Sequence, residues 1–301
     1  MDPEMVAQVR RFNRIVTQRV GALNDRFLSR DRSLGEARVL WEIGARERDV
    51  RSLRTQLDLD SGYLSRLLRS LEATGLVTVG AKASDRRVRI ASLTAAGTNE
   101  RAVLDRRADE LAAEVLEPLG AAQRARLVAA MAEVERLLTA SMVEVESVDP
   151  ADPRARACHR AYFAELNDRF DAGYDPALGL PADDDELRPP AGLQLLASLH
   201  GEPVGCGALM FHDGYAHLRR MWVAESARGL GVGRRLLTEL ESRAADHGAW
   251  ATRLETNKAL EEALALYRSA GYVEVAPFND EAYANHWFEK PITSAGEQSL
   301  Q

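Results

Sequence analysis

The stretch Arg228–Arg234 reads Arg-Gly-Leu-Gly-Val-Gly-Arg, and these residue types suit the binding of phosphate groups. Glycine lets the backbone adopt positive φ and approach a ligand closely. The first amides of a helix have no partner within that helix, and the helix dipole adds positive potential at the same end. Arg228, Arg234 and Arg235 would add fixed positive charge. The stretch therefore predicts a pocket for a pyrophosphate.

Two regular elements must position this stretch. A strand is predicted at 218–223, and an amphipathic helix follows the glycines to about His247, because apolar residues recur there at three-to-four spacing. The phosphate-binding pattern GxxxxGK[ST] is absent, since no Lys-Ser or Lys-Thr pair follows the glycines. The dinucleotide fingerprint GxGxxG also fails, because Gly229, Gly231 and Gly233 run GxGxG.

The order Arg-x-x-Gly-x-Gly resembles the acetyl-CoA loop of the GNAT family of N-acetyltransferases; the alternative is an ordinary glycine-rich connection. The resemblance implies acetyl-CoA as cosubstrate, with its pantetheine arm on the backbone of the preceding strand and a backbone amide near Val223 polarising the thioester carbonyl. It also implies that Asn257 hydrogen-bonds the pantetheine chain. The cofactor-binding residues predicted in this way are Met221, Trp222, Val223, Arg228, Gly229, Leu230, Gly231, Val232, Gly233, Arg234 and Asn257.

Acetyl transfer to an amine needs a proton acceptor for the ammonium and a proton donor for the leaving thiolate. Tyr267 matches the family's usual general acid, and its alternative role is that of a core aromatic. Glu255, at the end of a strand, is the candidate base, acting directly or through water, and a structural salt bridge is the alternative. His217 and Glu225 are reserve candidates for the base.

Arg219 and Arg220, on the strand before the glycine-rich loop, could hold a carboxylate of the substrate; the alternative is a solvated strand face. The segment 279–290 is similar to small GNAT enzymes that act on small amines or amino acids. The expected acceptor is therefore the amine of a small molecule.

The remaining pattern of the second half agrees with the α/β fold of the GNAT family from about residue 142 to 291. A strand is expected at 143–148 and a helix at 153–170, and the loop 171–190 follows with a solvated acidic centre at 183–186. Further strands are expected at 193–199, 204–211, 216–223, 251–255, 273–276 and 286–289, with a helix at 260–270.

The first half predicts a winged helix-turn-helix, which is mainly helical. Helices are expected at 5–29, 34–45, 50–57 and 62–74, and a strand at 76–79, a turn at 81–86 and a returning strand from Val88 follow. The helix 62–74 has an apolar face of leucines and a basic outer face, which suits the major groove of DNA, and the ribbon tip can reach the backbone or the minor groove.

The segments 61–66, 71–77 and 85–87, followed by 93–97, resemble the MarR family of bacterial regulators. In that family the Asp and Arg of the wing pair with one another and present the Arg to DNA, and the resemblance gives these roles to Asp85 and Arg86. A solvated basic face is the alternative. The predicted DNA-binding residues are Ser61, Gly62, Tyr63, Ser65, Arg66, Arg69, Asp85, Arg86 and Arg87.

Two further helices, 96–116 and 121–140, carry more apolar residues than a small winged domain can cover, which implies a partner. MarR-like proteins dimerise through their terminal helices, so the resemblance implies a homodimer on palindromic double-stranded DNA, with half-sites about one helical turn apart. The chain is thus expected to hold two domains, a MarR-like domain at 1–141 and a GNAT domain at 142–301.

Composition sets wider limits. Residues 1–141 hold 24 Lys and Arg against 20 Asp and Glu, a charge of +4, and residues 142–301 hold 15 against 26, a charge of −11. This asymmetry favours two partners of different charge. No apolar run of about eighteen residues or signal peptide is evident, so no membrane association is expected. Cys158 and Cys206 are expected to be buried, reduced thiols, which favours a cytoplasmic protein without a metal site.

The sequence favours a bifunctional protein, a DNA-binding dimer with a working N-acetyltransferase. One alternative is a sensor whose second domain binds acetyl-CoA or an amine without turnover. A protein-lysine acetyltransferase is another. A third alternative makes the first half a dimerisation scaffold, but the wing pair Asp85-Arg86 argues against that.

Overall fold

A computed structural model describes residues 1–21, 28, 32–44, 46–82, 84–180 and 183–292. The chain divides into two compact units, 1–132 and 133–301. This division falls within one helix, α6 (Ala121–Ser141), and the boundary predicted at 141/142 lies at the end of that helix. The last turns of α6 belong with the second unit, where Arg136 Nη1 donates a hydrogen bond to the carbonyl of Gly229 at 3.0 Å.

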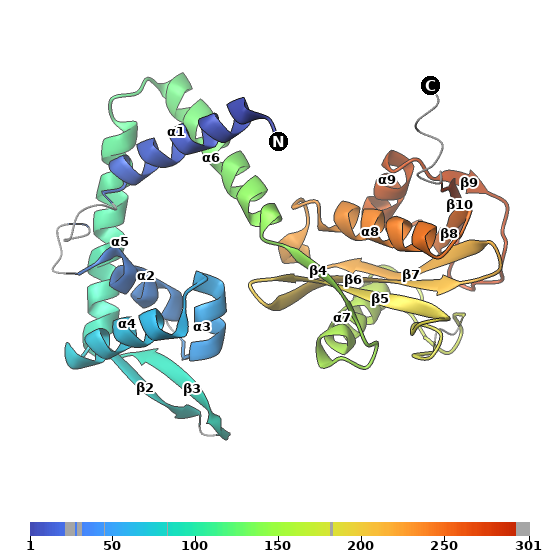
Figure 1. Ribbon diagram of the computed structural model, residues 1–301, viewed down its shortest axis with the longest axis horizontal. Coiled ribbons are helices and arrows are strands. Elements are labelled where there is room, and N and C mark those ends of the chain that lie inside the picture. The colour runs from blue at the N-terminus through green and yellow to red at the C-terminus, as the bar shows by residue number, and fades with distance from the viewer. Residues whose placement is uncertain (22–27, 29–31, 45, 83, 181–182, 293–301) are drawn as a thin grey trace. The chain divides into compact units, whose positions relative to one another are not determined.

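The first unit has the helices and three-stranded sheet of a winged helix domain (Figure 1). Its sheet has the order β1-β3-β2, with antiparallel pairing throughout. The elements are α1 (Pro3–Arg19), α2 (Leu34–Ile43), β1 (Arg48–Asp49), α3 (Val50–Leu57), α4 (Ser61–Ala73), β2 (Val77–Lys82), β3 (Asp85–Leu93), α5 (Ala95–Leu116) and the first part of α6.

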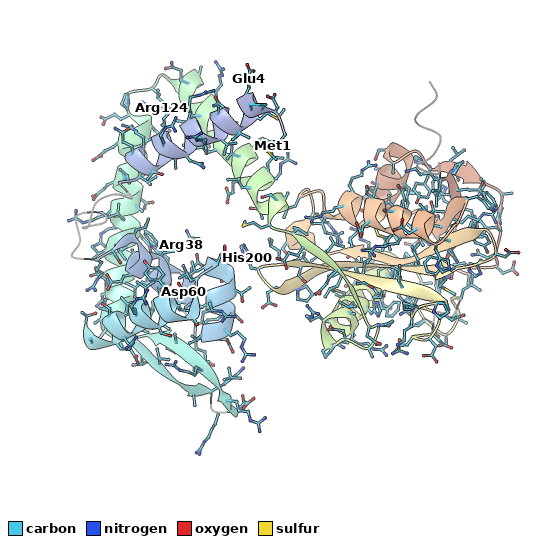
Figure 2. The ribbon with its side chains drawn as sticks, in the orientation of Figure 1. Met1, Glu4, Arg38, Asp60, Arg124 and His200 are labelled. Atoms are coloured by element: carbon cyan, nitrogen blue, oxygen red, sulfur yellow. The ribbon has the colours of Figure 1, made fainter. Side chains whose placement is uncertain are left out.

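Helix α4 has the apolar face that its sequence predicts. Leu64, Leu67, Leu68 and Leu71 are all buried in the core of this unit. The helix begins at Ser61 because the side chain of Asp60 accepts a hydrogen bond from the amide of Tyr63 at 2.8 Å. Figure 2 labels Asp60 at this end of α4. The burial of one face fixes which side chains of α4 point to solvent.

The wing joins α5 through a close backbone contact. The hydroxyl of Thr94 accepts a hydrogen bond from the amide of Gly97 and donates to the carbonyl of Gly75. A Cβ atom at Gly97 would lie 2.0 Å from the carbonyl oxygen of Leu76, so only glycine fits here. The base of the wing is therefore fixed to the first turn of α5.

The helices α1 and α6 bury none of their side chains in this chain. Met5, Val9 and Ile15 of α1 are 66%, 57% and 62% exposed, and several large apolar residues of α6 are exposed as well. Arg124, labelled in Figure 2, pins the α5–α6 connection by donating to the carbonyls of Leu116, Glu117 and Leu119. The sequence predicts a partner for the helices 96–116 and 121–140, so the exposed surface of α6 belongs to that prediction and the exposed surface of α1 adds to it.

The second unit is a seven-stranded mixed sheet covered by helices, in the order β4-β5-β6-β7-β8-β10-β9. Helices α8 and α9 lie on one face of this sheet and α7 lies on the other (Figure 1). Its elements are β4 (Glu144–Val148), α7 (Pro153–Arg169), β5 (Gly192–Leu199), β6 (Glu202–Phe211), β7 (Tyr215–Val223), the 3-10 turn η2 (Glu225–Ala227), α8 (Val232–Asp246), β8 (Ala251–Thr256), α9 (Glu261–Ser269), β9 (Val273–Val275) and β10 (His286–Pro291).

Two irregularities open this sheet next to the glycine-rich loop. Strands β7 and β8 are parallel and pair only from Tyr215↔Ala251 to His217↔Arg253, so their later residues diverge. The pairing of β6 with β7 shifts register between Cys206 and Ala208, which marks a bulge in β7. The diverging strand ends expose backbone groups that a sheet normally pairs. A binding site is expected at such an opening.

Several boundaries differ from the sequence predictions. Helix α1 ends at Arg19; of the predicted remainder 20–29, residues 22–27 and 29 lie outside the described residues. The two-residue strand β1 was not predicted, because it is defined only by its pairing with β3. The wing strands also extend into the predicted turn 81–86, ending at Lys82 and restarting at Asp85.

In the acidic run 183–186, Asp183 and Asp185 are exposed and Asp184 and Glu186 are half-buried. Asp184 pairs with Arg156, and Asp185 pairs with Arg188 at 2.6 Å. Cys158 and Cys206 are both buried free thiols. Over the described ranges, no helix is long and apolar enough to cross a membrane. The same residues contain no cluster of His, Cys, Asp or Glu side chains that could hold a metal ion.

Candidate functional site

The glycine-rich loop has the backbone geometry that its sequence predicts. Gly229 and Gly231 both have φ of +78°, a conformation that side chains other than glycine rarely adopt. A Cβ atom at either position would meet nothing within 4 Å, so the space above them is open. Gly231 is the N-cap of α8, and no side chain caps this end of the helix.

The amides at the start of α8 have no acceptor in the described part of the chain. The first hydrogen bond of the helix runs from the amide of Arg235 to the carbonyl of Gly231. The amides of Val232, Gly233 and Arg234 therefore point out of the first turn unpaired, with the positive end of the helix dipole. Such a cluster of donors suits an anion.

The arginines of the loop are held by neighbouring groups. Arg228 Nη2 lies 2.6 Å from Glu165 of α7, and Arg234 Nη2 donates to the hydroxyl of Ser269 at 2.5 Å. Arg235 donates to the carbonyl of Val143 and does not line the loop's cavity, so the expectation that it adds charge there is wrong. The first turn of α8 thus offers mainly backbone donors.

A cavity of about 440 Å³ lies over this loop. Of the eleven predicted cofactor residues, nine line it: Met221, Trp222, Val223, Arg228, Gly229, Gly231, Val232, Gly233 and Arg234. Leu230 instead packs against the hydrophobic core. Asn257 lines a neighbouring cavity, where its side-chain nitrogen donates to the carbonyl of Tyr283 at 2.6 Å.

The neighbouring cavity, of about 300 Å³, is lined by aromatic and charged side chains. It includes Phe163, Phe170 and Tyr174 together with Arg219, Arg220, Glu255 and Glu281. Tyr162, Met221 and Tyr267 line both cavities, so the two spaces share one wall. A reactant in one cavity would therefore lie next to a reactant in the other.

Tyr267 occupies the shared wall. Its side chain is 6% exposed, and its hydroxyl has no hydrogen-bond partner among the described residues. Burial, with a smaller contribution from the charge of Glu255, raises the pKa of Tyr267 above its ordinary value. The hydroxyl thus stays protonated at neutral pH, as a proton donor must.

Glu255 lies at the centre of a buried polar network in the second cavity. His217 Nε2 donates to Glu255 Oε2 at 2.6 Å, and Arg219 Nη1 lies 3.3 Å from Glu255 Oε1. Asn279 donates to Oε2 at 3.0 Å. Burial acts to raise the pKa of Glu255, but the hydrogen bond and charge of His217 and the charge of Arg219 outweigh it, so its pKa lies below the ordinary value. The carboxylate is ionised.

Two residues of α7 belong to the site although the sequence did not single them out. Tyr162 lines both cavities, and burial raises its pKa. Glu165 accepts a hydrogen bond from Trp222 Nε1 at 2.8 Å and pairs with Arg228. Nothing in the sequence of an amphipathic helix shows that its residues face a loop some sixty residues later. The reserve base Glu225 lines neither cavity.

The predicted DNA-binding residues of α4 lie on its outer side. Arg66 and Arg69 are exposed, as are Ser61 and Gly62, while Tyr63 and Ser65 are half-buried. The guanidinium of Arg66 lies 5.5 Å from the centroid of the Tyr63 ring, and Arg69 Nε donates to the carbonyl of Ser65 at 3.1 Å. The structure therefore brings these residues together on one solvent-facing surface.

The wing residues Asp85, Arg86 and Arg87 are exposed near the tip of the β2–β3 hairpin. The expected ion pair between Asp85 and Arg86 is not formed in the described structure. The carboxylate of Asp85 instead accepts the backbone amide of Arg87 at 3.0 Å. This hydrogen bond lies within the turn that contains Asp85. The Asp85 carboxylate therefore does not hold the side chain of Arg86 in place.

Comparison with protein families identifies both domains. Residues 159–272 match the acetyltransferase (GNAT) family, and residues 35–97 match the winged helix DNA-binding domain. The first match contains the glycine-rich loop, Glu255 and Tyr267, and the second contains α4 and the wing.

Relatives match the second domain in part. An IAA acetyltransferase from Azospirillum brasilense is 41% identical over 86 residues, which are 28% of this chain and 56% of that protein. The Uncharacterized N-acetyltransferase YjcF of Bacillus subtilis is 39% identical over 71 residues, 24% of this chain and 49% of its own. The chain thus spans about half the length of these curated relatives.

Solved structures of similar form also cover one domain. The acetyltransferase yncA from Salmonella typhimurium, solved with its cofactor acetyl-CoA, is 14% identical with a TM-score of 0.40, and the match covers 53% of this chain and 99% of that one. The order of the elements, the glycine-rich loop and the two family matches together establish the organisation. The chain joins a winged helix DNA-binding domain to an acetyltransferase domain of the GNAT family.

Proposed function

We propose that the protein is a DNA-binding regulator that also transfers the acetyl group of acetyl-CoA to the amine of a small molecule. The observation that carries this proposal is the shared wall between the two cavities. Unpaired amides for an anion lie at one end of the first cavity, an ionised carboxylate lies in the second, and a protonated tyrosine lies between them.

The proposed position of acetyl-CoA follows from the hydrogen-bond donors of the glycine-rich loop. The amides of Val232, Gly233 and Arg234 would bind the phosphates of acetyl-CoA, and the diverging end of β7 would hold the pantetheine arm by its backbone. When bound, acetyl-CoA supplies the activated acetyl group. A backbone amide near Val223 would stabilise the oxyanion that forms at the thioester carbonyl.

We assign the acceptor amine to the second cavity. Glu255 takes a proton from its ammonium, directly or through water, and the free amine attacks the acetyl carbonyl. As the tetrahedral intermediate collapses, the carbon–sulfur bond breaks, Tyr267 gives its proton to the departing thiolate, and the attacking nitrogen releases its second proton to solvent. The products are the N-acetylated amine and CoA, and both side chains return to their starting states by exchange with solvent.

The dimensions of the second cavity favour a small acceptor. At about 300 Å³ it lies at the lower end of the ~300–1,000 Å³ typical of small-molecule sites. Its lining residues come from α7, β7, β8 and the segment around Tyr283, which surround one compact space and so favour a small molecule over an extended peptide. A lysine on a protein surface fits it less well.

The DNA-binding half is proposed to act as a homodimer on a palindromic site. Arg66 and Arg69 of α4 would enter the major groove, and Arg86 of the wing would reach the backbone or the minor groove. The exposed apolar residues of α1 and α6 would form the dimer contact. The expected cellular location of such a regulator is the cytoplasm.

One experiment tests both activities on the same preparation. Purified protein is incubated with acetyl-CoA and a panel of small primary amines, and CoA release is followed with a thiol reagent. Gel-shift titrations with DNA from upstream of the protein's own gene are run in parallel. Amine-dependent release with sequence-dependent binding supports the proposal, and release that is no faster with amine than without it contradicts the enzymatic part.

A sensor without turnover is the second candidate, and one contact favours it. Arg136 of α6 donates to the carbonyl of Gly229, so the helix that leaves the first unit is bonded to the phosphate loop. If the second domain only senses, operator DNA must change the affinity for acetyl-CoA by the same factor by which acetyl-CoA changes the affinity for DNA. Calorimetric titration of acetyl-CoA with and without DNA, set beside the CoA-release assay, separates the two candidates.

A further inference from the structure

The second cavity is lined in part by aromatic rings that do not pack into a hydrophobic core. Phe163, Phe170, Tyr174 and Tyr283 all line it, and all four are half-buried. None of them belongs to a core cluster of the described part of the second unit or packs against one. Apolar surface left uncovered in a concave site is available to a ligand.

These four rings form one connected cluster. Tyr174 stacks on Phe163 at a centroid distance of 5.6 Å and lies 4.8 Å from Tyr283. Phe170 lies 6.0 Å from Tyr174 and 5.6 Å from Tyr283. The angles between ring planes range from 13° to 75°, so the cluster presents both faces and edges. A further aromatic ring can join such an arrangement, because aromatic pairs favour offset-stacked and edge-to-face contacts.

A hydrogen bond holds the cluster in place without ligand. The hydroxyl of Tyr283 accepts from the amide of Asp175 at 2.8 Å, which joins the segment after α7 to the segment before β10. The polar end of Tyr283 is thereby bonded to backbone, and its ring is the part that remains for the cavity. A pre-organised wall of this kind lowers the entropy lost when a ligand binds.

The charged residues that line the same cavity are predominantly acidic. Three carboxylate side chains line it, those of Asp183, Glu255 and Glu281, against the guanidinium groups of Arg219 and Arg220. Arg219 is shared between two of the carboxylates, since Nη1 lies 3.3 Å from Glu255 and Nη2 lies 3.6 Å from Glu281. Such surroundings favour a cationic ligand and disfavour one that brings a further carboxylate.

Arg220 is engaged with the protein. Its Nη1 lies 3.4 Å from His159 Nδ1, and His159 Nε2 lies 3.0 Å from the side-chain oxygen of Gln194. Its guanidinium also lies 5.7 Å from the centroid of the Phe163 ring. The rings and the carboxylates are therefore the groups to which we assign recognition of the acceptor.

On the proposed acetyltransferase function, we propose that the acceptor is a primary amine joined to an aromatic ring by a short alkyl chain, without a carboxylate. The ring packs against Phe170, Tyr174 and Tyr283, and the ammonium faces Glu255. The charge of −11 on residues 142–301 favours the approach of such a cation. Phe170, which has no polar group, is a specificity-determining residue.

The kinetic test compares four probes, each with saturating acetyl-CoA: 2-phenylethylamine, 2-cyclohexylethylamine, ethylamine and L-phenylalanine. Burial of the ring is expected to raise kcat/KM for 2-phenylethylamine about 10- to 100-fold above that for ethylamine. Aromatic contacts should raise it about 2- to 10-fold above that for 2-cyclohexylethylamine. The carboxylate of L-phenylalanine should lower kcat/KM by about tenfold or more, because like charges repel in a confined site.

Substitutions at Phe170 test the assignment of the ring cluster. Phe170→Leu keeps an apolar side chain and removes one ring, so the ratio of kcat/KM for 2-phenylethylamine to that for 2-cyclohexylethylamine should fall by about fivefold. Phe170→Tyr keeps the ring and should retain the ratio. Phe211→Leu is the matched control, because Phe211 stacks on His247 at 3.7 Å and lines neither cavity. Circular dichroism confirms that each variant is folded.

A binding experiment separates this inference from the proposed enzymatic function. The four probes are titrated calorimetrically into protein saturated with CoA, so that no turnover is needed. Binding that is tightest for 2-phenylethylamine and weakened in Phe170→Leu supports the inference, even if no probe is acetylated. Failure of every probe to release CoA counts against the enzymatic function alone.

Three results overturn the inference and leave the acetyltransferase proposal intact. The first is binding of 2-cyclohexylethylamine or L-phenylalanine as tight as that of 2-phenylethylamine. The second is an order of affinities that is unchanged in Phe170→Leu. The third is undetectable binding of all four probes to the CoA-saturated protein.

Discussion

The imidazole of His217 and the carboxylate of Glu255 form a buried pair, with Nε2 2.6 Å from Oε2 and both side chains 6% exposed. Glu255 also contacts Arg219 and Asn279, so the candidate base is ionised and fixed in one orientation. This geometry fits a positioned proton acceptor, and it equally fits a structural ion pair. The two roles differ in what a conservative substitution does.

Glu255→Gln keeps the shape of the side chain and removes its ability to take a proton. If Glu255 is the base, kcat is expected to fall by about 100-fold or more, since general base catalysis contributes ~10²–10⁴. Steady-state kinetics at several pH values measure this effect. A variant that melts at a lower temperature yet turns over normally would show that the carboxylate serves only the ion pair.

Tyr267→Phe removes the hydroxyl from the wall that the two cavities share. We expect kcat to fall by about 100-fold with little change in KM for acetyl-CoA, because the thiolate loses its proton donor. Tyr162→Phe is the matched control, since Tyr162 also lines both cavities. Gel shifts should be unchanged in both variants. If Tyr162→Phe proves the more damaging, the acid has been assigned to the wrong tyrosine.

Gly231→Ala tests the phosphate loop through its backbone. At φ of +78° an alanine is strained, but its Cβ would meet nothing within 4 Å, so no clash complicates the result. The distorted loop is expected to raise the dissociation constant for acetyl-CoA by about 10-fold, corresponding to ~1.4 kcal/mol. Gly248→Ala, with φ of +85° and equally open space at the other end of α8, carries the same strain away from the loop. Equal affinity in the two variants would argue that the loop does not bind the cofactor.

His159 should make stability depend on pH. Its pKa in the folded protein is lowered to about 4, so between that value and its unfolded value of ~6.5 the unfolded state binds more protons. The stabilisation is fully present above about pH 6.5 and is lost as the pH falls towards 4, by up to ~3 kcal/mol. Urea unfolding of the unsubstituted protein and of His159→Gln across this range measures the difference. A difference that does not change with pH would mean that folding does not lower the pKa of His159.

Arg66→Ala and Arg86→Ala should weaken DNA binding in a salt-dependent manner. Each phosphate contact contributes about −0.9 to the slope of log affinity against log salt concentration, so each lost contact flattens that slope by roughly this amount. Arg38→Ala is the control, because Arg38 is exposed in the same domain but paired with Glu42 at 2.7 Å. Fluorescence anisotropy with labelled DNA gives the slopes, and unchanged slopes in both variants would remove α4 and the wing from the interface.

The local parts of the site could be predicted from the sequence. Glycines at positions 229 and 231 indicate positive φ in the loop, whatever its tertiary surroundings. The spacing of the leucines in α4 alone defines the buried face of that helix. Tyr267 was predicted because it matches a family pattern, and Glu255 because it ends a strand that lines the cleft. Such features depend on residues close together in the chain.

The features that the sequence did not reveal depend on tertiary contacts. Nothing near Arg220 signals its left-handed backbone, which arises from the register shift against β6. The chain from Gln194 through His159 to Arg220 joins three elements, and Tyr162 reaches the site from α7. Asn257 carries a pattern typical of the cofactor site, yet its amide bonds to Tyr283 instead. The hydrophobic periodicity of the sequence does not show which of these tertiary contacts a side chain makes.

The contact between Gly97 and Leu76 has a mechanical consequence. Because no side chain fits between the first turn of α5 and the base of the wing, and Thr94 bonds both, we expect these two elements to move together. A tilt of the long helix α5 would then displace the tip of the β2–β3 hairpin, because the base of the hairpin is bonded to the first turn of α5. A small rotation of α5 would in this way produce a larger displacement at the point where the wing is proposed to touch DNA.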